Sequence, residues 1–217
     1  MTRTSAVSDE WPKYDYGKVS GMRLFTAVEP PPEAVVQLSS TVYTGRELFP
    51  ELRWTSPEDW HLTLVFLGEV PDELVPDLTE GLGRAVAGHH PLSLEVDGWG
   101  TFPERSRRSS VLWAGFAGDI EPLTDLADDL REAARGVGLH VTDMPYVPHL
   151  TVARSRPARD LRRTLHELTA PQGPTWRVGE VHLVESVPGR SPRYRTVRTW
   201  PLPWKTHPDR TSERSTS

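Results

Sequence analysis

His61-Leu62-Thr63-Leu64 and His149-Leu150-Thr151-Val152 are two copies of one short pattern in this chain of 217 residues. In each copy, a histidine and a threonine stand two residues apart, with apolar residues interleaved. Because side chains alternate across a β-strand, the pattern predicts two half-buried strands whose His and Thr share one face. The apolar residues, as far as Phe66 in the first copy, are expected on the core face. Two such strands can bring two imidazoles and two hydroxyls to one cleft, which suits acid–base chemistry on a phosphate.

The two copies occupy the same place in a repeated order of elements. The hydrophobic pattern predicts strand, helix, strand, helix and strand in residues 22–100, and the same order again in residues 110–187. His149 follows His61 by 88 positions (149 minus 61). The same offset separates two further pairs of equivalent positions, Arg23 with Val111 and Asp72 with Asp160. We therefore expect an α+β fold of two lobes related by a pseudo-twofold axis, with antiparallel sheets facing a central cleft and helices outside.

A single domain over residues 22–204 accounts for the patterned part of the chain. Residues 1–21 and 205–217 are polar and rich in Ser, Thr, Pro and charge, so they predict disordered tails. Neither end holds an apolar run, so no signal peptide or membrane-spanning helix is expected. The chain has no cysteine, which excludes disulfides, thiolate zinc sites and a cysteine nucleophile. A monomer in the cytoplasm is the simplest expectation.

The net charge of −5 differs from the strong basicity of proteins that bind duplex nucleic acid. A local basic patch can still bind RNA. Arg105, Arg107 and Arg108 form a charged loop that is either a solvated turn or a guide for RNA. Arg154 follows the second motif and is a candidate phosphate ligand. Strict alternation places it opposite His149, however, so only a β-bulge or the strand end would turn it inward.

Aromatic side chains form a second group of candidates, because a nucleobase can stack on them. Phe25 is the preferred candidate for base stacking, since its strand is expected beside the motif strands. The other aromatic candidates are Trp54, Trp60 and Tyr194. A third H-x-T, His140-Val141-Thr142, is interpreted as linker, because it follows a helix stop and continues into polar sequence.

The quoted motifs resemble those of a known family. HLTLVFLGEV (residues 61–70) and VPHLTVAR (residues 147–154) resemble the two H-x-T-x motifs of the two-histidine (2H) phosphoesterases. The closer resemblance is to the LigT-like RNA 2′,3′-cyclic phosphodiesterases. MRLFTAVEPP, which begins at residue 22, resembles that family's opening strand, and residues 193–200 resemble its closing strand. The resemblance spans about residues 22–203 and shows no departure at the motif positions.

The resemblance implies hydrolysis of RNA 2′,3′-cyclic phosphate ends to 2′-phosphate ends by metal-independent, two-histidine catalysis. It implies that His61 is the proton donor and His149 the proton acceptor, without a cofactor or a membrane. Thr63 and Thr151, on the same faces as the histidines, are expected to donate hydroxyl hydrogens to the phosphate. Reversal of the reaction would join RNA ends through a 2′-5′ linkage without ATP.

Three alternatives remain open. The chain could be a 2H enzyme for another phosphodiester, such as a 2′-5′ oligonucleotide or a small cyclic nucleotide. It could be a non-catalytic module that binds RNA ends, although the presence of all four motif residues disfavours this. Two histidines and a carboxylate could hold zinc, but neither motif has a carboxylate at ligand spacing.

Overall fold

The computed structural model describes residues 20–104 and 107–204. The predicted disordered tails and Arg105 lie outside the described residues, except that Ser20 and Gly21 are described and Gly21 already belongs to the first strand. The described elements follow one another as β1 (Gly21–Val28), α1 (Pro32–Leu48), β2 (Arg53–Trp54), η1 (Pro57–Asp59), β3 (Leu62–Pro71), η2 (Asp72–Leu74), α2 (Val75–Ala87), β4 (Leu92–Phe102), β5 (Ser109–Gly118), α3 (Ile120–Gly136), β6 (His149–Arg159), α4 (Arg162–Glu167), β7 (Trp176–Val178), β8 (Glu180–Ser186) and β9 (Tyr194–Pro201).

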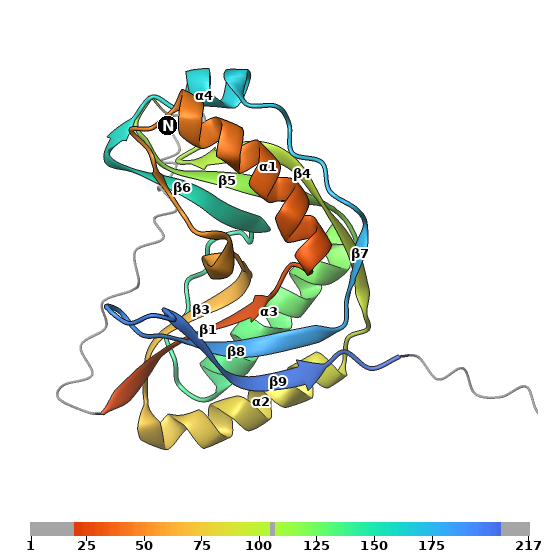
Figure 1. The fold of residues 1–217 in the computed structure, drawn as a ribbon. Coiled ribbons are helices and arrows are strands. Elements are labelled where there is room, and N and C mark those ends of the chain that lie inside the picture. Colours follow the sequence, from red (N-terminus) through yellow and green to blue (C-terminus); the bar gives the residue numbers. More distant parts are fainter. Residues whose placement is uncertain (1–19, 105–106, 205–217) are drawn as a thin grey trace, which may run out of the picture.

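The strands form two antiparallel sheets, which confirms the predicted α+β class. A four-stranded sheet has the order β3-β1-β8-β9, and a five-stranded sheet has the order β2-β6-β5-β4-β7 (Figure 1). The first motif strand, β3, therefore lies at an edge of one sheet. The second motif strand, β6, lies between β2 and β5 in the other sheet. Each sheet supplies one histidine and one threonine.

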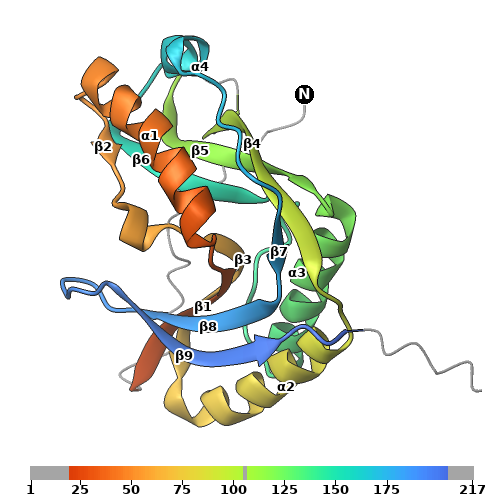
Figure 2. The same cartoon turned by 45° about the vertical axis from the view of Figure 1, so that its right-hand side comes forward.

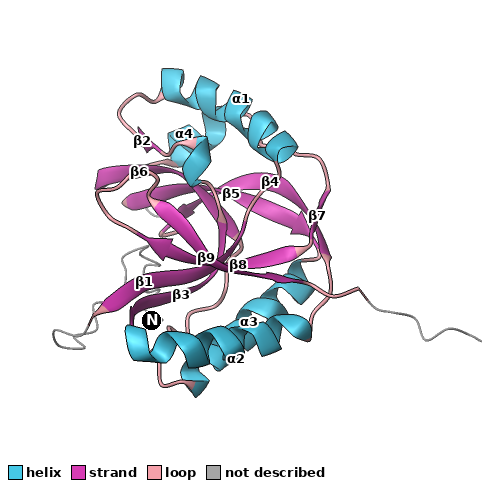
Figure 3. Cartoon of the chain, turned by 60° about the horizontal axis from the view of Figure 1, so that its bottom comes forward, coloured by secondary structure: helices cyan, strands magenta, loops and turns pink. Residues whose placement is uncertain are grey.

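Helices cover the outer face of each sheet, as predicted. Figure 3 shows α1 and α4 above the strands and α2 and α3 below them, so the two sheets lie between the helix layers. Leucine and alanine side chains of α3 recur on one face and are fully buried: Leu123, Leu126, Ala127, Leu130 and Ala134. Their burial removes apolar surface from water and holds the helix on its sheet. None of the helices in the described ranges is both long enough and apolar enough to cross a membrane.

The offset of 88 positions recurs in the observed elements. Helices α1 and α3 start at Pro32 and Ile120 and end at Leu48 and Gly136, so both ends obey it. The order β3-β1-β8 in one sheet also matches the order β6-β5-β4 in the other. The third strand of each half thus crosses to the opposite sheet, and each lobe contains strands from both halves. This exchange joins the two lobes covalently in both directions.

Both motif strands contain a β-bulge shortly after the threonine. In β3, Thr63 pairs with Ala27 and Val65 pairs with Thr26, which leaves Leu64 as the extra residue. A bulge of this kind shifts the alternation by one position for the residues that follow. The prediction that Phe66 faces the core with Leu62 and Leu64 is therefore wrong. Phe66 instead pairs with Phe25 and packs with it in a small apolar cluster apart from the main core.

The equivalent bulge in β6 determines where Arg154 lies. Thr151 pairs with Trp113 of β5, whereas Ala153 pairs with Leu112, so Val152 is the extra residue. Val152 and Ala153 are both fully buried in the main core. Arg154 then pairs with Val111 and returns to the face that carries Thr151 and His149. We call this face of each sheet, turned away from its covering helices, the inner face.

Candidate active site

The two motif histidines are held by the same hydrogen bond. Nδ1 of His61 lies 2.8 Å from the carbonyl oxygen of Asp59, and Nδ1 of His149 lies 2.8 Å from that of Val147. Each partner is the residue two positions earlier. Because a carbonyl oxygen only accepts hydrogen bonds, Nδ1 carries the hydrogen in both rings. Nε2 is then the nitrogen that accepts a proton in the neutral ring and donates one in the charged ring.

Aromatic side chains fix the orientation of the His61 ring. The ring centroid of Phe25 lies 4.7 Å from that of His61, and Tyr194 meets His61 edge-on at 4.8 Å. Phe25 and Tyr194 also touch each other, with centroids 5.5 Å apart. Phe25 is only 1% exposed. A platform for a nucleobase needs an open face, so the geometry favours Phe25 as a support for His61 rather than as a stacking surface.

A second aromatic pair surrounds His149, and sequence reasoning missed it. Phe102 meets the His149 ring edge-on at 4.8 Å, and Trp113 lies 6.0 Å from it. The Trp113 ring lies over Gly100 of the neighbouring strand, where any Cβ would overlap the indole. Trp113 stands 88 positions after Phe25 (113 minus 25), so the offset that relates the histidines could have identified it. Each imidazole is thus supported by two aromatic rings from its own sheet.

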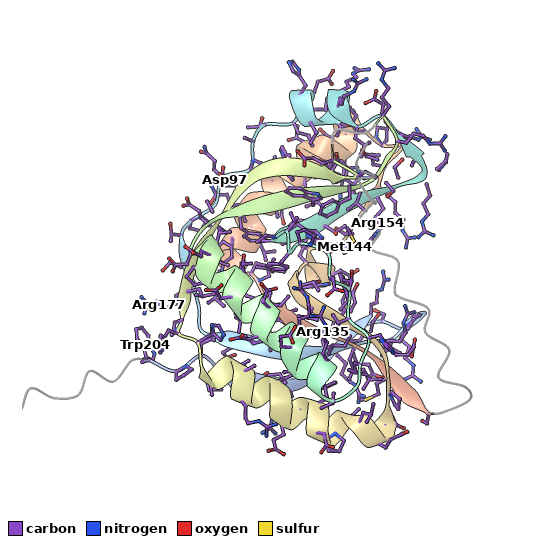
Figure 4. All side chains as sticks on the ribbon, turned by 180° about the vertical axis from the view of Figure 1, so that it is seen from behind. Asp97, Arg135, Met144, Arg154, Arg177 and Trp204 are labelled. Carbon is purple, nitrogen blue, oxygen red and sulfur yellow. The ribbon has the colours of Figure 1, made fainter. Side chains whose placement is uncertain are left out.

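The segment before His149 ties the second motif to the first motif strand. The hydroxyl of Tyr146 donates a hydrogen bond of 3.0 Å to the carbonyl oxygen of Thr63. Burial raises the pKa of this hydroxyl far above its ordinary value, so the group stays protonated and acts as the donor. The same segment is held from the other side by Arg135 of α3, which donates to Val141 O at 3.3 Å and pairs with Asp143 (Figure 4).

The segment before His61 makes the reciprocal tie. Thr55 Oγ1 lies 2.9 Å from the carbonyl oxygen of Thr151 and 3.0 Å from that of Val152, and Thr55 N donates to Val152 O at 2.9 Å. Trp60, the residue before His61, donates its indole hydrogen to Thr55 Oγ1 at 2.9 Å. Each motif is therefore bonded to the backbone of the other motif strand. The Tyr146 bond joins β3 to the segment before β6, and the Thr55 bonds continue the pairing of β2 with β6. Through its bond to Thr55, Trp60 connects the residue before His61 to this pairing.

Loss of the Tyr146 hydroxyl tests this tie. We expect Tyr146→Phe to lower the free energy of unfolding by about 0.5–1.5 kcal/mol, because the variant removes one hydrogen bond to a largely buried residue. It should also reduce kcat several-fold, since the two motif strands lose a direct contact. Tyr43 is 65% exposed on α1, so Tyr43→Phe makes the same chemical change where no effect is expected. Equal melting temperatures and equal kcat values for the two variants would contradict this role.

Several predicted residues lie elsewhere or serve packing. Trp54 donates to Phe49 O at 3.1 Å and packs against Gly45, so it supports α1. Trp60 is 4% exposed and acts through Thr55, as described above. Arg107 and Arg108 are exposed in the bend that precedes β5. His140 lies in the irregular segment before β6, which confirms its interpretation as linker.

The structure brings together His61, Thr63 and Phe25 on one inner face, and His149, Thr151 and Arg154 on the other. Figure 4 labels Arg154 on β6, where its register partners are Arg53 of β2 and Val111 of β5. In the described ranges, no three His, Asp or Glu side chains gather in a group that could hold a metal ion. The arrangement offers two proton-transfer groups, two hydroxyl donors and one guanidinium.

Comparison with known proteins gives this site a family. A model of the 2′-5′ RNA ligase superfamily matches residues 30–190. An RNA 2′,3′-cyclic phosphodiesterase of Geobacillus stearothermophilus is 31% identical over 180 residues, which cover 82% of this chain and 56% of that protein. One of Thermotoga maritima is 32% identical over 133 residues, which cover 61% of this chain and 70% of that protein. The chain thus spans little more than half the length of the Geobacillus relative.

A solved structure shares the fold over nearly its whole length. The crystal structure of E. coli LigT complexed with 3′-AMP superimposes with a TM-score of 0.67 and 28% sequence identity. The match covers 84% of this chain and 99% of the LigT chain. The family model, the relatives and the shared fold agree with the paired motifs on the two inner faces. The chain belongs to the 2′-5′ RNA ligase superfamily, the two-histidine phosphoesterases that its motifs resemble.

Proposed function

We propose that this protein hydrolyses RNA 2′,3′-cyclic phosphate ends to 2′-phosphate ends. The observation that carries the proposal is the pair of identically anchored histidines, each followed by a threonine on the same inner face. The names of the Geobacillus and Thermotoga relatives support the substrate class. The LigT complex with 3′-AMP supports a nucleotide as the bound group.

The two imidazoles can complete the reaction between them. One accepts a proton from water through Nε2, and the water oxygen forms a bond to phosphorus. The bond between phosphorus and the 3′ oxygen breaks, and the other imidazole donates its proton to that oxygen. The phosphate remains on the 2′ oxygen. Because both rings donate the same Nδ1 hydrogen bond to a backbone carbonyl, either ring can act as proton donor or as proton acceptor. The assignment of His61 as donor and His149 as acceptor follows the family resemblance.

The remaining groups would hold the phosphate while its charge shifts. Thr63 and Thr151 each offer a hydroxyl hydrogen to a non-bridging oxygen. Arg154 offers a planar guanidinium, which can bind two phosphate oxygens at once. Its place three residues after Thr151, beyond the bulge, supports this role. Each step is assigned to groups of this chain, without a metal or cofactor.

Ligation is the second candidate, and the superfamily's name favours it. The 5′-hydroxyl of a second RNA would take the place of water, and the products would be a 2′-5′ linkage and a free 3′-hydroxyl. The same base and acid serve both reactions.

The proposal also keeps two expectations from the sequence. One is a monomer, to be measured by light scattering. The other is a cytoplasmic location, which rests on the cysteine-free composition.

The product decides between these readings. We expect the purified protein to convert an oligonucleotide with a 2′,3′-cyclic phosphate end to a 2′-phosphate, identified by phosphorus NMR. A 3′-phosphate product would contradict the proposed bond cleavage. Faster turnover of a 2′-5′ oligonucleotide or of a 3′,5′-cyclic nucleotide would favour another 2H substrate, and binding without turnover would favour an RNA-end-binding module. Activity lost in EDTA and restored by zinc would favour the metal alternative.

A further inference from the structure

The hairpin between β8 and β9 places an arginine beside the His61 support. The register pairs Ser186 with Tyr194, and Val187 N donates to Arg193 O at 2.8 Å, so the loop closes immediately before Tyr194. Figure 2 shows this hairpin, in blue, projecting from the edge of the four-stranded sheet. The hydrogen bonds that close the hairpin therefore fix where the backbone of Arg193 lies.

The Arg193 side chain extends over the aromatic ring that contacts His61. Its guanidinium carbon lies 5.4 Å from the centroid of Tyr194, and the Tyr194 ring lies 4.8 Å from that of His61. Only one aromatic ring thus separates the charged group from the imidazole. The attraction between a guanidinium and a ring face restricts the arginine and holds it at this side of the site.

Within residues 20–104 and 107–204, no acidic side chain neutralises the charge of Arg193. Arg193 is exposed, and in the described part of the chain it forms no ion pair. Glu185, the acidic residue near the loop of this hairpin, is instead bonded to Arg195, with Nε at 2.9 Å and Nη2 at 2.6 Å from its Oε2. The hairpin therefore presents an uncompensated guanidinium at the edge of the site.

At this position Arg193 can contact a second phosphate if the substrate is an RNA end. The terminal nucleotide of an RNA carries the reacting cyclic phosphate on one side and an ordinary phosphodiester on its 5′ side. A cyclic mononucleotide lacks that second anion. Resting on the proposed function, we propose that Arg193 binds the phosphodiester 5′ to the terminal nucleotide and so favours RNA chains over cyclic mononucleotides. Arginine suits this contact because its guanidinium matches two phosphate oxygens.

The test compares two substrates and two arginines. Arg193→Gln removes the charge beside the site. Arg198→Gln removes the same charge from β9, the strand that begins just after Arg193, but Arg198 pairs with Leu183, a core residue on the helix side of the sheet. For each protein, KM is measured with a short oligonucleotide ending in a 2′,3′-cyclic phosphate and with 2′,3′-cyclic AMP.

We expect Arg193→Gln to raise the ratio of the two KM values, oligonucleotide over mononucleotide, by about tenfold. Arg198→Gln should keep the wild-type ratio. The salt dependence of KM for the oligonucleotide should weaken in Arg193→Gln by a slope of about 0.7, the share of one phosphate contact on a single strand. Arg193→Lys should recover much of this slope, since it restores the charge. A role in folding alone would not move the salt slope.

An unchanged KM ratio in Arg193→Gln, or equal changes in Arg193→Gln and Arg198→Gln, would overturn this inference while leaving the proposed function intact. A proportional rise of both KM values would also overturn it, because it would indicate that Arg193 only supports Tyr194 and His61. Failure of the wild-type protein to hydrolyse either substrate would overturn the proposed function, and this inference with it.

Discussion

His61→Ala and His149→Ala should each reduce kcat for hydrolysis of a cyclic-phosphate-ended oligonucleotide by about 10²–10⁴-fold. Each variant removes one of the two Nε2 atoms, and each atom is needed for one of the two proton transfers. The anchoring bonds of the two rings run to backbone carbonyls of their own segments, so the other histidine should keep its position. The kcat of the double variant should be only slightly lower than that of the less active single variant, because the two groups act as a unit.

His140→Ala is the matched control for this experiment. His140 begins the third H-x-T of the chain but lies in the irregular segment before β6. The same substitution there should leave kcat near the wild-type value. Circular dichroism should show the wild-type fold in all four variants, the double variant included. Retained activity in both His61→Ala and His149→Ala would contradict the two-histidine mechanism.

Removal of the threonine hydroxyls should have the next largest effect. We expect Thr63→Val and Thr151→Val each to lower kcat/KM by about ten- to a hundredfold, which corresponds to the loss of about 1.5–3 kcal/mol from a hydrogen bond to a charged oxygen. Valine keeps the β-branched shape that the strand accommodates, so the backbone bonds to Tyr146 and Thr55 should persist.

Serine variants separate the hydroxyl from the packing. Thr63→Ser and Thr151→Ser keep the donor and lose only a methyl group, so they should retain most of the activity. Steady-state kinetics with one cyclic-phosphate substrate measure all four variants. If the serine variants lose as much activity as the valine variants, the threonines serve packing and the assignment of phosphate donors is wrong.

Much of this architecture was predictable from the spacing of the two histidines. The same 88 positions relate the starts and ends of α1 and α3, and the starts of β4 at Leu92 and β8 at Glu180. Local periodicity is sufficient for such elements, because burial of one face imposes a repeat on the sequence. The exchange of β4 and β8 between the sheets was not predictable in this way, since the sequence pattern of a strand does not determine which strand it pairs with.

The bulges explain why the faces of individual residues were harder to predict. Alternation predicts the core face, opposite the motif histidines, for both Phe66 and Arg154, yet both lie on the inner face beyond an extra residue. A bulge adds one position without a distinctive residue, because Leu64 and Val152 look like ordinary strand residues. The two ties through Tyr146 and Thr55 likewise depend on tertiary contacts between distant segments.

A crystal structure with a bound 2′-nucleotide tests the central claim most directly. The account predicts that the 2′-phosphate lies between His61 and His149, with Nε2 of each ring and the hydroxyls of Thr63 and Thr151 within hydrogen-bond distance of its oxygens. A phosphate bound away from this pair, with neither imidazole in contact, would contradict the account.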